Sequence, residues 1–314
     1  MGDAGIEEPM MNGSRASGTA VPDGRPVPAG RLVILLGPAV LVVGLLFVGG
    51  LVLGVLQALG YAPGQGAASL TVEHFRRVLV DPELFTSFAL TFYIAATSTI
   101  IAGLVSVALA LTLVSLESRS RMVSFLLQIP LTVPHLVIAI AVLFLLTPSG
   151  LVARALSSLG LLAEAASFPL LVNDRFGIGI LAVYVWKEIP FITLMLLAVL
   201  KNMGKELLEA GATLRANARQ RFFHITLPII TPVLAASGLI VFAFTFGAFE
   251  VPYLLGRTHP LLLPVWSYRT YSDIDLLARP EGIAIGLLIA AIIIIAVGCS
   301  QMVLTLVRYR EGER

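Results

Sequence analysis

Five long runs of the chain contain no Asp, Glu, Lys or Arg, and they constrain the fold more than any other feature of the sequence. They cover residues 32–72, 84–116, 122–153, 222–249 and 282–307. Each exceeds the roughly 20 residues that an α-helix needs to cross a bilayer. In a further apolar stretch, at about 176–200, only Lys187 and Glu188 carry charge.

The composition and the pattern of these runs decide the fold class. Only 13% of the residues are charged and 57% are hydrophobic, whereas a soluble domain has about 25% charged residues. The runs do not alternate apolar with polar positions, as the strands of a membrane β-barrel do, and a helix satisfies its own backbone groups in lipid. We therefore expect an all-α, polytopic membrane bundle of about six helices, with spans near 32–58, 86–114, 123–146, 176–200, 228–255 and 282–307.

The two ends are expected to lie outside this transmembrane domain, which we place at 32–308. Residues 1–31 are rich in Gly, Pro and Ser and predict a disordered tail, and 309–314 form a short second tail. The first 30 residues lack the apolar region and cleavage site of a signal peptide, so we expect the first span to be retained.

The distribution of basic residues predicts the orientation. With both termini in the cytoplasm, the inner segments carry 13 Lys and Arg and the outer segments carry 7. Inner connections are normally the more basic ones. We therefore expect a multi-pass membrane protein with both ends in the cytoplasm.

The motifs of common enzyme sites are absent from the sequence. It contains no G-x-x-x-x-G-K-[ST], H-E-x-x-H, C-x-x-C or G-x-S-x-G. The four histidines lie in different segments without metal-ligand spacing, Cys299 is the single cysteine, and a net charge of +2 does not indicate nucleic acid. We expect no cofactor, no metal and no catalytic residues, so that any energy the protein uses must come from elsewhere.

The connection 201–227 is the most basic inner loop, and its pattern predicts two short helices. Ala218, Phe222 and Ile225 lie on one face of the second helix, and Pro228 opens the next span. On composition alone, the loop could also be a basic helix pair attracted to anionic lipid.

This loop resembles the EAA loop of binding-protein-dependent ABC importer permeases. The matching positions are Glu209, Ala210, Gly211, Arg215, Ile225, Leu227 and Pro228. The family has a second Ala at position 211 and a turn Gly at position 215. A Gly suits a turn with positive φ, and Arg there costs about 1 kcal/mol, so Asn217 could take the left-handed conformation instead.

The resemblance covers about 70–308 and is closest to the spermidine/putrescine-type branch. It includes SLTVEHFRRVLVDPELFTSFALTF, QIPLTVPHLVIAIAVLFLL and GAFEVPYLLG. It implies a second permease chain, identical or homologous, and cytoplasmic ATPase subunits that receive the loop as a coupling helix. It also implies an extracytoplasmic solute-binding protein and a location in the bacterial plasma membrane.

Four ionisable residues lie within the expected spans: Lys187, Glu188, Glu250 and His135. A charge at membrane depth costs at least ~2.5 kcal/mol and indicates a function. Lys187 could form an ion pair with Glu250 or with a partner chain, line the solute path, or extend toward an interface. His135 could pack in the bundle or bind a ligand. Carboxylates suit a cationic solute, although Lys187 offsets one of them.

Two further features concern the outer side of the predicted bundle. Residues 70–84 predict a short amphipathic helix at the interface, which anchors the loop or docks a partner. Aromatic residues form a stripe in the fifth span (Phe242, Phe246, Phe249 and Tyr253) and a group in the last outer loop (Trp266, Tyr268 and Tyr271).

We interpret the chain as the translocation subunit of an ATP-driven importer for a polyamine or similar small organic cation. The alternatives are a secondary transporter or channel, which needs no ATPase, and a membrane-embedded enzyme, which would show converging His, Asp or Ser.

Overall fold

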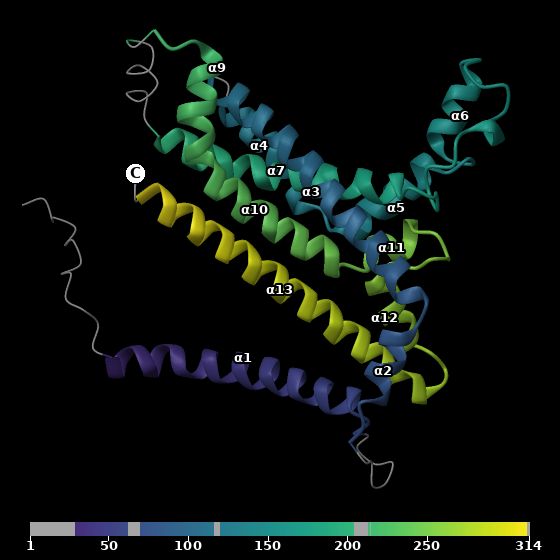
Figure 1. Ribbon diagram of the computed structural model, residues 1–314. Helices are drawn as coiled ribbons and strands as arrows, with labels where there is room; N and C mark the ends of the chain where they lie inside the picture. Colours follow the sequence, from purple (N-terminus) through teal and green to yellow (C-terminus); the bar gives the residue numbers. More distant parts are fainter. Residues whose placement is uncertain (1–28, 62–69, 116–119, 204–212, 214, 313–314) are drawn as a thin grey trace, which may run out of the picture. The chain divides into compact units, whose positions relative to one another are not determined.

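The computed structural model (Figure 1) describes residues 29–61, 70–115, 120–203, 213 and 215–312. The described residues form helices and connections without strands, which confirms the all-α prediction. The chain divides into two units, Met1–Val52 and Leu53–Arg314.

Six helical segments in the described part are long and apolar enough to span a membrane, as predicted. Three are helices by themselves: α1 (Ala29–Ala58), α3 (Glu83–Ser115) and α7 (Ile178–Asn202). The other three are composite: α5 (His135–Leu146) with α6 (Leu151–Ser158), α9 (Ala218–Arg221) with the π-helical segment η2 (Phe222–Thr226) and α10 (Leu227–Gly247), and η3 (Leu276–Ala278) with α13 (Arg279–Gly312).

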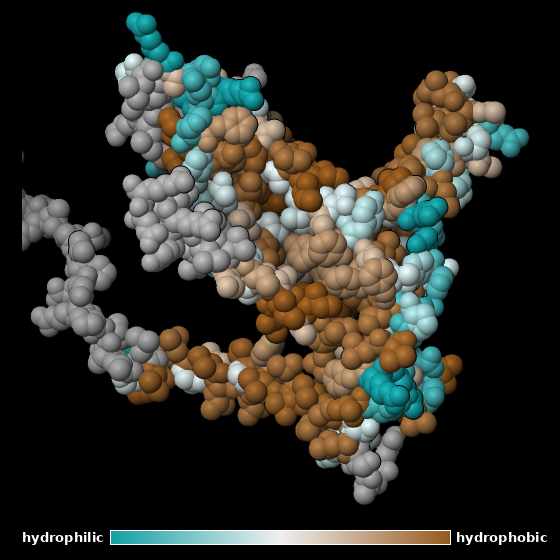
Figure 2. Space-filling model, viewed as in Figure 1, coloured by the Kyte–Doolittle hydropathy of each residue, from teal (hydrophilic) through white to brown (hydrophobic). Residues whose placement is uncertain are grey.

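The first unit contains most of α1, whose described side chains are almost all apolar and exposed. Leu46 is 68% exposed and Phe47 is 71% exposed, and hydrophobic side chains cover the helix (Figure 2). Without charges between Leu32 and Ala58, this surface suits contact with lipid.

In the second unit, α7 is the central helix. It contacts α3, α10, α5, α11 (Glu250–Leu255) and α4 (Ser120–Thr132) (Figure 1). In its most apolar stretch of 18 residues, 56% of the residues are buried. The Asp174 carboxylate accepts hydrogen bonds from the backbone N–H groups of Phe176 and Ile178, and it fixes the turn from which α7 begins. Side chains in the middle of α7 are therefore held inside the bundle.

Two predicted spans are broken, which corrects the sequence prediction. The third, at 123–146, consists of α4 and α5 with Val133 and Pro134 between them. Pro134 lacks the N–H that would continue the helix and disfavours helical backbone at Val133. The fifth, at 228–255, consists of α10 and α11 with Ala248 and Phe249 between them. The aromatic residues predicted as one stripe therefore lie on two helices.

The amphipathic helix predicted at 70–84 is present as α2 (Glu73–Val80). It packs against α13, with Val78 buried and Phe75 partly buried in the same cluster as Ile285. Val72 and Leu79 are exposed.

Candidate functional site

Lys187 lies in the middle of α7 and is only 6% exposed. Its ammonium donates hydrogen bonds to the carbonyl oxygens of Val133 at 2.5 Å, Pro130 at 2.7 Å and Leu131 at 3.5 Å. The last carbonyls of a helix have no partner within the helix, and a cation at this end also interacts favourably with the helix dipole. Lys187 therefore caps the end of α4 at the helix break.

This geometry excludes one of the expected roles of Lys187. In the part of the chain that the structure describes, no ion pair joins Lys187 to Glu250. The pairing of these two residues within the chain is therefore wrong, because backbone carbonyls take the place expected for the carboxylate.

Glu188, the next residue of α7, points to other helices. Its Oε1 atom accepts hydrogen bonds from the hydroxyls of Thr245 at 2.6 Å and Ser98 at 3.3 Å. Its Oε2 atom is buried and has no partner among the described residues. Glu188 thus joins α7 to α3 and α10 and keeps a free acceptor in the interior.

Glu250 and His135 each stand directly after a helix break. Glu250 is the first residue of α11 and His135 the first residue of α5, and these two helices pack against each other. The His135 ring lies 4.8 Å from the Phe244 ring and 6.3 Å from the Tyr184 ring, measured between centroids. The Tyr184 hydroxyl is buried without a partner in the described structure.

The four predicted residues therefore surround the two helix breaks without forming ion pairs with one another in the described part of the chain. The positive charge of Lys187 is directed to the end of α4. The two carboxylates and the Tyr184 hydroxyl remain available to another polar group.

A second group of predicted residues lies in the loop before α10. Arg215 has φ = 57° and is in the left-handed region. Asn217 has φ = −71° and caps α9 through a reciprocal capping box with Gln220, at 2.8 and 2.9 Å. The suggestion that Asn217 takes the left-handed conformation is therefore wrong, since Arg215 itself makes the turn.

Beyond this turn, the chain passes through α9 and the π-helical segment into α10. Ile225 lies in the π-helical segment, and Leu227 and Pro228 begin α10, which agrees with the predicted second helix running into Pro228. Hydrophilic side chains gather over α9 (Figure 2). Glu209, Ala210 and Gly211 lie outside the described residues.

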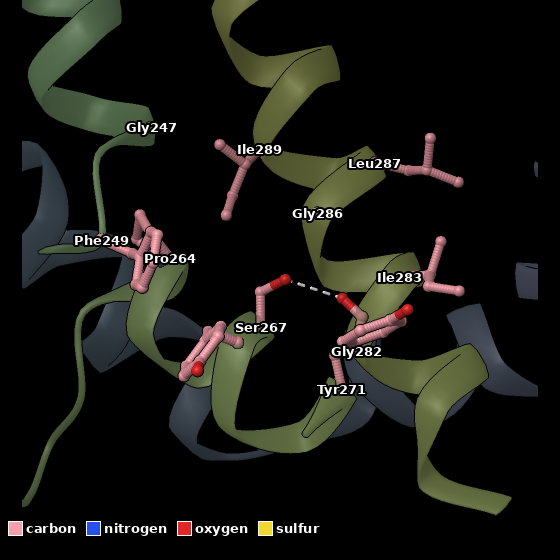
Figure 3. A pocket seen from close by; sticks show the side chains of 11 residues that line it. Gly247, Phe249, Pro264, Ser267, Tyr271, Gly282, Ile283, Gly286, Leu287 and Ile289 are labelled. Carbon is pink, nitrogen blue, oxygen red and sulfur yellow. Dashed lines mark hydrogen bonds between the residues drawn. The ribbon is translucent and has the colours of Figure 1, made fainter. Parts of the chain in front are cut away.

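A groove of about 420 Å³ lies where α10 ends, between α12 (Leu263–Tyr271) and α13 (Figure 3). Phe249 stacks on Tyr268 with 4.8 Å between ring centroids, and both line the groove. The Ser267 hydroxyl donates a hydrogen bond to the Gly282 carbonyl at 2.8 Å and joins the two helices. Phe249, from the predicted stripe of the fifth span, and Tyr268, from the aromatic group of the last outer loop, thus contact each other here.

Ser98 and Thr245, which bind Glu188, were not identified from the sequence. Their signal was weak: each is a small hydroxyl residue within an apolar run. The acceptors of Lys187 are backbone carbonyls, which have no side-chain signature at all.

The comparisons with known proteins agree with this architecture. Residues 102–307 match the family described as "Binding-protein-dependent transport system inner membrane component". The chain is 28% identical to the Escherichia coli K12 inner membrane ABC transporter permease protein YdcU over 188 residues, which are 57% of this chain and 60% of the relative. It is 26% identical to the molybdenum transport system permease protein ModB of Mycobacterium tuberculosis over 71% of this chain and 82% of ModB.

A third relative is the sn-glycerol-3-phosphate transport system permease protein UgpA of Pectobacterium atrosepticum, with 32% identity over 54% of this chain and 57% of UgpA. The chain thus covers less than two thirds of YdcU and UgpA.

The fold also matches a solved structure. A crystal structure of a bacterial ABC transporter for the import of alginate gives a TM-score of 0.69 at 21% identity, covering 87% of this chain and 96% of the other. The family match extends over more than half of the sequence and includes the buried charges and the loop before α10. The chain therefore belongs to the family of binding-protein-dependent transport system inner membrane components.

Proposed function

We propose that this chain is the membrane-spanning translocation subunit of an ATP-driven importer and binds no nucleotide itself. The observation that carries the proposal is the loop 201–227, in a chain of this family. It combines a left-handed turn at Arg215 with a capped helix that leads into Ile225, Leu227 and Pro228. Because α9 is capped and continuous with α10, a movement of the loop can be transmitted to α10.

The proposed partners follow from this role. A cytoplasmic ATPase subunit receives the loop, with Glu209 at the contact and with Ala210 and Gly211 allowing close approach. A second permease, identical or homologous, completes the pathway, and an extracytoplasmic solute-binding protein delivers the solute. A solved alginate importer with a pentasaccharide-bound periplasmic protein has a similar fold, with a TM-score of 0.70, which supports such an assembly. The excess of Lys and Arg in the inner segments supports a cytoplasmic loop and cytoplasmic termini.

The test of coupling is the charge reversal Glu209→Lys, with Glu206→Lys as the matched control in the same loop. A charge lost at a desolvated contact costs about 2–5 kcal/mol, so Glu209→Lys should reduce the co-purified ATPase more than tenfold. Uptake in vesicles should then disappear while membrane insertion remains normal. Glu206→Lys, which lies outside the motif, should retain both the ATPase and uptake. Normal uptake by Glu209→Lys, or uptake by this chain without any ATPase, would contradict the proposal.

The solute is proposed to be a polyamine or a similar small organic cation. Relatives are named for molybdenum, sn-glycerol-3-phosphate and ferric transport, so family membership leaves the solute open. The support comes from Glu188 and Glu250, which have no basic partner in the described residues. Glu250→Gln should reduce putrescine uptake by vesicles that contain the assembled transporter. Uptake of an anion that is insensitive to Glu250→Gln would refute this part of the proposal.

A further inference from the structure

A second cavity, of about 480 Å³, lies away from the buried charges, where α1 ends and α13 begins. Its polar lining comes from four helices and their connections: Gln57, Tyr61, His74, Arg77, Tyr271 and Arg279. None of its lining residues belongs to α5, α7 or α11, which carry Lys187, Glu188, Glu250 and His135. The cavity is therefore distinct from the proposed solute path.

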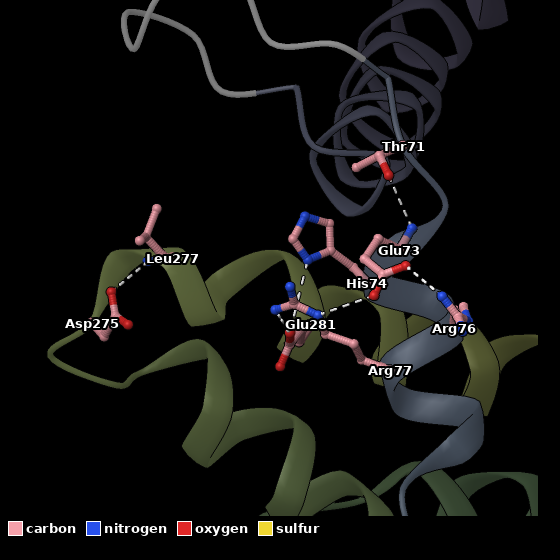
Figure 4. Close-up of polar contacts among 8 residues, drawn as sticks. All are labelled: Thr71, Glu73, His74, Arg76, Arg77, Asp275, Leu277 and Glu281. Carbon is pink, nitrogen blue, oxygen red and sulfur yellow. Dashed lines mark hydrogen bonds and ion pairs between the residues drawn. The ribbon is translucent and has the colours of Figure 1, made fainter.

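The charges around this cavity leave one guanidinium without a counterion. The Arg77 guanidinium bonds Glu281 at 3.0 Å and lies 3.5 Å from Glu73 (Figure 4). The hydrogen bond to Glu281 raises the pKa of Arg77, which keeps its charge. Arg279 lies over the Tyr271 ring at 5.7 Å, and within the described ranges no carboxylate is in ion-pair distance of it.

The position of the cavity corresponds to the surface layer of a membrane. The uncharged run of α13 starts at Gly282, one residue after Glu281, and α1 ends at Ala58, next to the lining residue Gln57. Beside the arginines, Leu276 and Leu277 line the cavity while being 51% and 71% exposed, and Ile274 is 99% exposed. Exposed apolar side chains next to arginines are typical of a segment at the membrane interface.

We propose that this cavity binds the phosphate of an anionic phospholipid. Arginine is the side chain best suited to phosphate, since its planar guanidinium presents several donors at once. Arg279 contacts the phosphate directly, and Arg77 contributes the N–H groups that Glu73 and Glu281 leave free. The hydroxyl-bearing headgroup lies toward Gln57 and Tyr61, while the acyl chains lie along Leu276 and Leu277. The bound lipid would tie Gln57 and Tyr61 to α2 and α13.

The test measures lipid retention by the full-length chain, purified with its partner subunits, in nanodiscs of phosphatidylglycerol and phosphatidylcholine. Native mass spectrometry counts the lipids that remain bound after the complex has been released from the nanodiscs. Arg279→Gln should lower phosphatidylglycerol retention about tenfold, the effect of one lost charge-assisted contact, and Arg279→Lys should restore part of it. The matched control is Arg269→Gln, because Arg269 also lies over a tyrosine, Tyr253, at 6.0 Å but is outside the cavity. This control should leave retention unchanged.

Four outcomes would overturn the proposal. Equal losses in Arg279→Gln and Arg269→Gln would show that net charge alone attracts the lipid. Equal retention of phosphatidylcholine and phosphatidylglycerol would remove the case for an anionic headgroup. Displacement of the lipid by millimolar inorganic phosphate would indicate a site for a free anion. Arg279 can also be probed with a reagent that modifies guanidinium groups. If the lipid does not protect Arg279 and an added solute-binding protein does, the cavity is a protein contact.

Discussion

Replacing Lys187 with Met distinguishes a backbone cap from an ion pair. The change leaves two close carbonyl acceptors, those of Val133 and Pro130 at 2.5 and 2.7 Å, without their donor. Hydrogen bonds to a charged group contribute about 1.5–3 kcal/mol each, so the loss is about 3–6 kcal/mol. Removing the buried ammonium returns about 2.5 kcal/mol. We expect a net loss of about 0.5–3.5 kcal/mol, the difference between these terms.

The assay is the thermal unfolding of the detergent-solubilised complex, with four proteins compared: unchanged, Lys187→Met, Glu250→Gln and both together. Because the two side chains do not pair, the double variant should be no more stable than Lys187→Met alone. Lys201→Met, in the last turn of the same helix and exposed, should change little. If Glu250→Gln restores the stability of Lys187→Met, Lys187 is paired with that carboxylate and the capping argument fails.

Two further predictions concern single backbone positions. Arg215→Gly should stabilise the protein by about 1 kcal/mol and retain transport, because glycine adopts φ = 57° without strain; a lower midpoint in thermal unfolding would show that the Arg215 side chain makes contacts worth more than the strain. Gly282→Ala should destabilise by about 1–3 kcal/mol through overpacking, since its Cβ would lie 2.5 Å from the Tyr271 backbone nitrogen. Gly298→Ala, whose Cβ meets nothing within 4 Å, is the control, and equal effects of the two substitutions would contradict the packing argument.

Much of the fold could be predicted from charge patterning, because a helix in lipid must be long and uncharged. The positions of the helix breaks could not be predicted in this way. Pro134 is a visible signal for the first break, but prolines also occur within α4, α7 and α10 without ending them. The break at Ala248 and Phe249 contains no proline itself, although Pro252 follows Ala248 by four residues, where its ring would clash with the Ala248 carbonyl in a continuous helix.

The contacts of the four buried ionisable residues could not be predicted from the sequence. Lys187 and Glu188 stand out because charge is rare in these spans, whereas their partners come from residues 54 to 90 positions away. In the turn of the loop, Asn prefers the left-handed conformation more than Arg does, so the sequence favours Asn217 over Arg215 for it. The capping box with Gln220 holds Asn217 in an extended conformation, so a local hydrogen bond outweighs that preference.

The capping of α4 by Lys187 also bears on the order in which the chain enters the membrane. Synthesis runs from the N-terminus, so the carbonyls of Pro130 and Val133 are already in place when Lys187 arrives, and its ammonium finds acceptors at once. The partners of Glu188 are synthesised at different times. Ser98 precedes it, but Thr245, which donates the shorter hydrogen bond to Glu188 at 2.6 Å, is synthesised later. The Glu188 carboxylate therefore gains its Thr245 contact only after α10, the helix that follows the loop 201–227, has inserted.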